Sequence, residues 1–172
     1  MAQPKRERSL RRLTVRRKPG WPARGWLMAG QLSLPVALGR TGIKANKREG
    51  DGATPRGTFR LTRLRWRADR HPRPATLLPV QRISSDDGWC EDPTDRRYNR
   101  PVKVPPHSKA DRLKRLDDLY DFIVEIDHNT RPRVAGRGSA VFIHVARPGF
   151  APTGCCERPV PGRPVGPRAA RV

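Results

Sequence analysis

The residues whose types suit covalent chemistry lie near the C-terminal end of the sequence, in the stretch Phe142-Ile-His-Val-Ala-Arg-Pro-Gly-Phe-Ala-Pro-Thr-Gly-Cys-Cys156. His144 ends an apolar run, and Gly154 and Cys155 follow a loop rich in proline and glycine. Only the thiolate of a cysteine is strongly nucleophilic, so a cysteine nucleophile needs a neighbouring base. A histidine at a strand end and a cysteine after the next loop can form that pair. The backbone N–H groups around Gly154 could then stabilise an oxyanion.

Two other interpretations fit the same residues. His144 can be a core histidine and the cysteines small hydrophobic residues, because a short spacing in sequence is only weak support for catalysis. A zinc site would take its ligands from Cys90, Cys155 and Cys156 with one of His71, His107, His128 or His144. Structural zinc prefers cysteines separated by two to four residues, a spacing that adjacent cysteines do not offer, so we expect no metal site.

The chain is strongly basic. It carries 37 Lys and Arg against 16 Asp and Glu, a formal net charge of +21. This charge predicts affinity for polyanions such as nucleic acid, an anionic membrane surface or acidic cell-wall polymers. No nucleic-acid-binding motif accompanies the basic residues, and the tryptophans form no stacking pattern with them. We therefore expect no specific nucleic-acid partner.

The length of 172 residues fits one domain with tails. We expect a basic N-terminal arm at 1–11, a catalytic-type domain at 12–156 and a proline-rich, disordered tail at 157–172. The apolar residues after the basic arm are interrupted by Gln31, Ser33 and Pro35, so neither a signal peptide nor a transmembrane helix is predicted. The three cysteines cannot all pair within one molecule, and no disulfide framework is expected.

Short apolar runs between turn residues predict a mainly β fold with mixed sheets and one short helix. Strands are predicted at residues 12–17, on both sides of Ala29-Gly30, at 59–66, at 121–126 and at 139–145. A loop rich in Gly, Asp and Pro at 47–57 precedes the third of these regions. In the last strand Ala140, Phe142 and His144 share one face. The only helical character lies in Arg112–Tyr120.

Taken in order, four segments resemble the L,D-transpeptidase catalytic domain (YkuD) family, in a short stand-alone bacterial branch. They are "LPVALGRTGIKANKREGDGATPRGTFRL", "DDGWCEDPTDRRYNRPV", "DFIVEIDHNTRPRVAGRGSAVFIHVARPGFAPT" and the Gly-Cys that follows. The resemblance covers residues 12–155. It implies a β-rich, sandwich-like fold and a signature of a strand histidine followed by a loop ending in Gly-Cys, which maps onto His144, Gly154 and Cys155.

The resemblance also implies acyl transfer on peptidoglycan stem peptides. Cys155 would attack a tetrapeptide at its diaminopimelate carbonyl, release D-alanine and form a thioester that an amine or water resolves. His144 would act as general base and then acid, and Gly154 would lie in the oxyanion region. The segment 86–99 would shape the substrate side. A monomer in the cell envelope, with no cofactor, is the expected setting.

The signature of this chain departs from the family pattern. Thr153 meets Gly154 directly, where the pattern has one more residue, and Cys155 is followed by Cys-Glu-Arg-Pro rather than by a small apolar run. A frame change in the gene near codon 153 would explain both features and predicts weak catalysis. Cys156 is the alternative nucleophile, but it lacks a preceding glycine. The alternative function is a non-catalytic basic protein of this fold that holds cell-wall polymer or nucleic acid.

Overall fold

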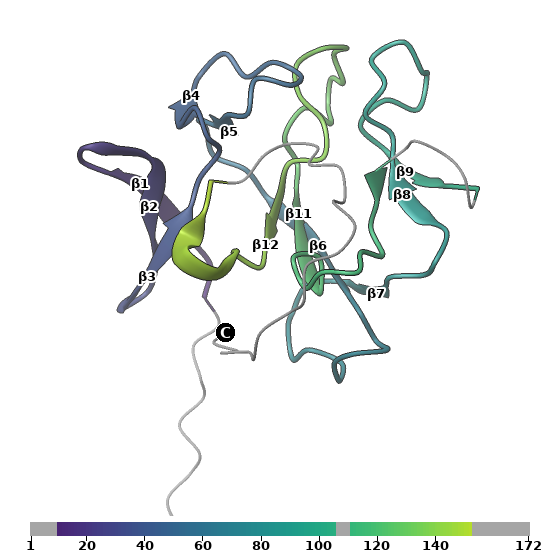
Figure 1. Cartoon of the computed structure of the whole chain (residues 1–172), viewed down its shortest axis with the longest axis horizontal. Helices are drawn as coiled ribbons and strands as arrows, with labels where there is room; N and C mark the ends of the chain where they lie inside the picture. Colours follow the sequence, from purple (N-terminus) through teal and green to yellow (C-terminus); the bar gives the residue numbers. More distant parts are fainter. Residues whose placement is uncertain (1–9, 106–110, 153–172) are drawn as a thin grey trace, which may run out of the picture.

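A computed structural model describes residues 10–105 and 111–152, which are built mainly of short strands (Figure 1). The strands are β1 (Leu13–Lys18), β2 (Trp21–Ala29), β3 (Leu32–Ala37), β4 (Ile43–Lys44), β5 (Thr54–Pro55), β6 (Leu61–Trp66), β7 (Val80–Arg82), β8 (Asp87–Trp89), β9 (Pro101–Lys103), β10 (Asp111–Arg112), β11 (Phe122–Ile126) and β12 (Phe142–His144). Within these ranges the one helical element is the short 3-10 helix η1 (Pro148–Phe150). The predicted mainly β fold with mixed sheets is confirmed.

The first sheet is the antiparallel meander β1-β2-β3. The predicted break at Ala29-Gly30 is confirmed as a tight hairpin, in which Ala29 pairs with Leu32 across a two-residue turn. Gly30 has a φ of 62°, a left-handed conformation that glycine adopts without steric penalty. A second two-residue turn joins Lys18 to Trp21. The face of this meander that carries Val15, Leu27 and Val36, called its inner face below, lies opposite β12.

The central sheet has the strand order β12-β11-β6-β7. β11 pairs antiparallel with β6 and β12, whereas β7 joins β6 in parallel, so the sheet is mixed. The strand predicted at 121–126 is confirmed as β11, in which Phe122, Val124 and Ile126 alternate with Glu125 and with Ile123, which is fully buried. β6 begins at Leu61, so Phe59 lies before the strand rather than in it.

The third sheet, β10-β8-β9, packs beside the central sheet and closes the core between them. The core cluster consists of Ile83, Trp89, Leu113 and Ile123, with Tyr120, Ala140 and Phe142 packed against it. The rings of Trp89 and Phe142 meet edge to face at 4.9 Å. Through Phe142, the core cluster therefore supports β12, the strand that carries His144.

The helix predicted for Arg112–Tyr120 does not form, and this prediction is wrong. The segment is short, and isolated helices of this length are marginal. The guanidinium groups of Arg67 and Arg70 take its carbonyl oxygens instead: Arg67 donates to Arg115 O at 2.6 Å, and Arg70 donates to Leu116 O at 2.8 Å and to Asp117 O at 2.9 Å. These tertiary hydrogen bonds hold the segment as a series of bends.

The strand predicted at 139–145 is shorter than expected. Only Phe142–His144 pairs with β11, because Ala140 adopts a left-handed φ of 49° and its N–H donates to Asn99 Oδ1 at 3.2 Å. Phe142 and His144 still share a face, since both rings contact Tyr120. Ala140 does not continue that alternation.

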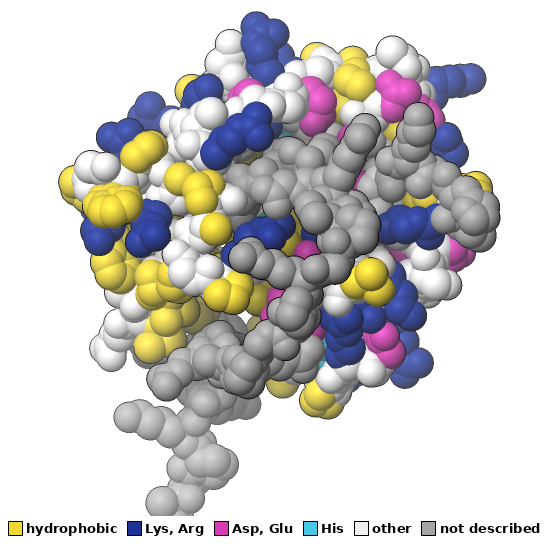
Figure 2. Space-filling view, viewed as in Figure 1, with side chains coloured by type: hydrophobic (Ala, Val, Ile, Leu, Met, Phe, Trp, Pro, Cys, Tyr) yellow, Lys and Arg dark blue, Asp and Glu magenta, His cyan; other side chains and the backbone are white. Residues whose placement is uncertain are grey.

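The surface mixes basic and apolar side chains. Figure 2 shows hydrophobic and basic side chains together over the part of the molecule that β1–β3 occupy in Figure 1. Large apolar side chains of β2 and β3 are exposed, with Trp21 51% exposed, Trp26 41% and Leu32 61%. No helix within the described ranges is long and apolar enough to cross a membrane.

Candidate active site

A pocket of about 180 Å³ lies between the inner face of the first sheet and β12. One wall comes from Val15, Leu27, Val36 and Leu38, and the opposite wall from Tyr120, Val141, Phe142, Ile143 and His144. The segment Gly52-Ala53-Thr54 and Glu91 also line the pocket. The pocket is therefore mostly apolar, with a few polar groups that converge on it, as expected for a ligand site.

His144 is the lining residue best suited to proton transfer. It pairs with Ile123 across the central sheet, and its Nδ1 lies 2.9 Å from Val145 O. A carbonyl only accepts hydrogen bonds, so Nδ1 carries the proton and Nε2 of the neutral ring is left to accept one. Burial lowers the pKa of His144 below its usual 6.5, and the positive charges of Arg115 and Arg147 lower it further. The ring is thus a neutral base near pH 7.

Tyr120 holds the imidazole in place. Its ring meets the ring of His144 edge-on at 5.4 Å and the ring of Phe142 at 6.3 Å. The guanidinium of Arg115 lies over the ring of Tyr120, 5.1 Å from the ring centre. The backbone is tied as well, since Val145 N–H donates to Leu119 O at 3.1 Å. Tyr120 therefore fixes the position of His144 from the neighbouring segment.

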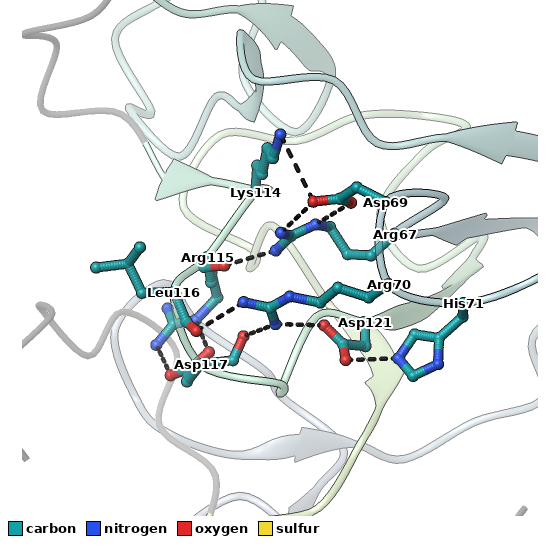
Figure 3. Close-up of polar contacts among 9 residues, drawn as sticks. All are labelled: Arg67, Asp69, Arg70, His71, Lys114, Arg115, Leu116, Asp117 and Asp121. Carbon is teal, nitrogen blue, oxygen red and sulfur yellow. Dashed lines mark hydrogen bonds and ion pairs between the residues drawn. The ribbon is translucent and has the colours of Figure 1, made fainter. Parts of the chain in front are cut away.

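The bends at 114–121 that carry Tyr120 are braced by a network of charged groups (Figure 3). Arg70 ion-pairs with the buried carboxylate of Asp121 at 2.7 Å, and His71 Nε2 lies 2.7 Å from the second oxygen of that carboxylate. Arg67 donates through Nε and Nη2 to the two carboxylate oxygens of Asp69, and its Nη1 donates to Arg115 O in the bend. These contacts hold in place the segment that carries Tyr120, and through it the pocket wall that contains His144.

The segment 86–99 supports the site mainly through the buried side chain of Asn99. Asn99 Oδ1 accepts from Trp89 Nε1 at 3.0 Å and from Ala140 N–H, and Asn99 Nδ2 donates to His128 O and Asn129 O. All hydrogen-bonding positions of this buried side chain are thereby used. Glu91 of this segment lines the pocket.

The pocket edge at Gly52–Thr54 is shaped by Asp51. Its carboxylate accepts from Lys47 Nζ at 2.6 Å and from the N–H groups of Arg48 and Ala53. Burial alone would raise the pKa of Asp51, but these hydrogen bonds lower it to about 2. Lys47 is itself 3% exposed. The loop at 47–57 is thus a fixed wall rather than a loose connector.

The loop that leads from His144 toward Cys155 is bent sharply at its start. Gly149 and Phe150 have φ values of 74° and 53°. Arg24 of β2 donates to Gly149 O at 3.2 Å, and its guanidinium lies 4.9 Å from the ring centre of Trp21. The first sheet therefore contacts the loop as well as lining the pocket.

The other candidate ligands of the zinc interpretation are dispersed. Cys90 is buried, with a pKa raised by burial, while His71 binds Asp121 and His128 Nε2 lies 3.0 Å from Arg137 O. Among the described residues no group of three His, Cys, Asp or Glu side chains could hold a metal ion. His107, Cys155 and Cys156 lie outside these residues.

Of the predicted site residues, the structure places His144 in the pocket; Gly154, Cys155 and Cys156 lie outside the described residues, and their roles remain predictions. Sequence reasoning missed Tyr120, Arg115, Glu91 and Arg24. Tyr120 carried one available signal, because this aromatic residue directly precedes the strand predicted at 121–126. The contact from Arg24 to Gly149 spans 125 positions and leaves no local pattern.

Comparison with known families agrees with this arrangement. A family model described as the L,D-transpeptidase catalytic domain (YkuD) matches residues 22–158. Neither the curated proteins nor the solved structures gave a match. The matched range covers most of the sequence and runs from the second residue of β2 past β12, so it includes His144 and the Gly-Cys signature. The chain belongs to the L,D-transpeptidase catalytic domain (YkuD) family.

Proposed function

We propose that this protein is a cysteine-dependent L,D-transpeptidase that acts on peptidoglycan tetrapeptide stems. The observation that carries the proposal is His144: it lines a pocket, its Nδ1 proton is held by Val145 O, and it begins the loop that leads to Cys155. The family match supports the reaction class. The substrate, the nucleophile and a location in the cell envelope are the parts proposed here.

In the first half-reaction Nε2 of His144 takes the proton of the Cys155 thiol as Sγ attacks the carbonyl carbon between diaminopimelate and the terminal D-alanine. The positive charges of Arg115 and Arg147, which disfavour a protonated His144, favour a thiolate nearby. Backbone N–H groups at Gly154 and Cys155 stabilise the oxyanion. The C–N bond then breaks, His144 gives its proton to the leaving amine, and a thioester remains.

In the second half-reaction an amine attacks the thioester carbon. The C–S bond breaks, and a proton of the amine passes through His144 to the sulfur of Cys155. Water in place of the amine gives hydrolysis and a carboxypeptidase outcome. No step requires a metal or an organic cofactor.

Thiol reactivity tests the nucleophile first. We expect iodoacetamide to modify Cys155 much faster than Cys90, whose buried thiol has a raised pKa. A His144→Ala chain should lose this advantage, and peptide mapping of the alkylated protein separates the three cysteines. Ordinary reactivity at Cys155 would support the second candidate, a non-catalytic wall-binding protein, which the net charge of +21 favours.

A Cys155→Ala chain separates the two cysteines of the signature. We expect it to release no D-alanine from a disaccharide-tetrapeptide, while Cys156→Ala still releases it. Release that persists in Cys155→Ala and disappears in Cys156→Ala would transfer the nucleophilic role to Cys156. A version with the reading frame restored near codon 153 should release D-alanine faster if the altered C-terminal segment weakens catalysis.

A further inference from the structure

The first sheet carries most of the large apolar side chains that are exposed. Of the nine such residues within the described ranges, six lie between residues 10 and 34: Leu10, Val15, Trp21, Trp26, Leu32 and Leu34. Trp21 begins β2, Trp26 is in its middle, and Leu32 begins β3. The side chain of Leu10 lies against the turn at Gly30. Exposed apolar groups therefore occur along the whole length of the meander β1-β2-β3, and such a patch marks an interaction surface.

The charges of the same stretch have one sign only. Residues 10–37 contain six Lys and Arg and no Asp or Glu, and none of the ion pairs between described residues involves them. Two of the cations lie over an exposed ring, since Lys18 Nζ is 5.6 Å and the guanidinium of Arg24 is 4.9 Å from the ring centre of Trp21. Figure 2 shows basic and apolar side chains mixed over this part of the molecule. The complementary partner is therefore anionic and has apolar material beside its charges.

An anionic phospholipid bilayer has both properties. Tryptophan favours the boundary between headgroups and acyl chains, and Lys and Arg near that boundary interact with the lipid phosphates. A hydrated anionic polymer would also attract the cations and could stack on the tryptophans, but it would leave Leu10 and Leu32 in water. The nine residues of β2 span about 30 Å, so the meander is long enough to lie along a membrane surface. The exposed leucines thus favour the bilayer over the polymer.

We propose that the meander β1-β2-β3 docks this protein on an anionic phospholipid surface. Trp21, Trp26 and Leu32 lie at the level where the acyl chains begin, and the basic side chains of β1 lie against the lipid phosphates. None of these three apolar residues lines the pocket, so the inference concerns a separate surface and does not rest on the proposed acyl transfer.

Co-sedimentation with vesicles tests this surface. The full chain is mixed with vesicles of phosphatidylcholine that contain about a third phosphatidylglycerol, or none, at physiological ionic strength. We expect Trp26→Ser to lower the partition coefficient for the anionic vesicles about tenfold, because a large apolar contact with the lipid is lost. Arg17→Gln combined with Lys18→Gln should lower it about fivefold for each charge removed. The matched control, Arg73→Gln combined with Arg82→Gln, removes two basic residues outside the first sheet and should lower it less than about twofold.

Fluorescence quenching distinguishes contact with the acyl chains from a purely ionic contact. Trp66 and Trp89 are buried, so bromine atoms on the acyl chains reach only the exposed Trp21 and Trp26. We expect anionic vesicles that contain brominated phosphatidylcholine to quench the unvaried chain, and Trp26→Ser to lose part of this quenching. The measurement on the unvaried chain does not depend on how any variant folds. Heparin serves as the hydrated polyanion for comparison, and Trp26→Ser should bind it as tightly as the unvaried chain does.

Three outcomes would overturn the proposal. If the unvaried chain does not bind the anionic vesicles, the meander is not a lipid-docking surface. If the control pair lowers vesicle binding as much as Arg17→Gln with Lys18→Gln does, the diffuse net charge accounts for the binding. If brominated lipid causes no quenching while Trp26→Ser weakens the binding of heparin, the surface recognises an anionic polymer. Release of D-alanine from soluble disaccharide-tetrapeptide is measured without lipid, so a failure of the proposed function is recognised separately.

Discussion

The two walls of the pocket are built in different ways. The wall with His144 and Tyr120 rests on the core cluster and on the ion pairs that Arg67 makes with Asp69 and Arg70 makes with the buried Asp121. The wall from the first sheet contributes none of the residues of that cluster and leaves Trp21, Trp26 and Leu32 largely exposed. The comparison indicates a division of roles: the central sheet fixes the reacting group, and the first sheet offers a surface to the ligand.

A core deletion on the braced side should have the largest effect. Leu113 is fully buried in the cluster, so Leu113→Ala should lower the free energy of unfolding by about 4 kcal/mol through lost burial and a cavity. Leu32→Ala, at a position 61% exposed, should cost less than about 0.5 kcal/mol. Urea denaturation of both variants measures the difference, and equal losses would break the contrast between the walls.

The charged network should be the next most sensitive feature. Asp121 is 3% exposed and binds both Arg70 and His71, so Asp121→Asn should cost about 3 kcal/mol of unfolding free energy. Asp69→Asn is the control within the same network; its side chain is 45% exposed, and the expected loss of unfolding free energy is much smaller. If the two variants unfold at the same urea concentration, the network does not brace the bends as described.

Tyr120 links the braced segment to the base. Tyr120→Leu removes the ring that contacts His144 and should slow D-alanine release by on the order of 10²-fold, because small displacements of a reacting group are costly. Tyr120→Phe keeps the ring and removes the hydroxyl, which donates to Asp111 at 3.4 Å, so about a threefold change is expected. A Phe variant as slow as the Leu variant would assign the effect to the hydroxyl group rather than to the position of the ring.

The lowered pKa of His144 gives a pH dependence. The base form is lost as the pH falls through a value below 6.5, so the rate of D-alanine release should hold at pH 6.5 and fall about tenfold for each pH unit below that lowered pKa. The unfolded chain binds the proton more tightly than the folded one, so stability also decreases on acidification below 6.5. A rate that already falls on going from pH 8 to pH 7 would contradict a neutral, buried base.

The smallest effect should come from the link between the two walls. Arg24→Met removes the hydrogen bond to Gly149 O and the contact with Trp21, and D-alanine release should fall about threefold, with a loss of less than about 1 kcal/mol in stability. Arg16→Met, on the neighbouring strand, is the matched charge control and should retain the original rate. A loss of 10²-fold in Arg24→Met would show that the first sheet positions the loop as strongly as the central sheet positions His144.

The sequence predicted the parts of this molecule that depend on local pattern. The turn at Gly30, the alternation along β11 and the place of His144 at a strand end follow from residue types two to six positions apart. The prediction of a helix at Arg112–Tyr120 was wrong because guanidinium groups from 46 to 48 positions away take the carbonyl groups of the bend. Glu91 and Tyr120 could not be assigned for the same reason, since pocket walls are assembled by long-range packing.

The measurement that tests the central claim most directly is mass spectrometry of the intact and digested protein after incubation with disaccharide-tetrapeptide. We expect released D-alanine and an acyl adduct on the peptide that contains Cys155 and Cys156, both absent in Cys155→Ala and strongly reduced in His144→Ala. Release of D-alanine by Cys155→Ala at the original rate, or an adduct that forms equally fast without His144, would contradict the account.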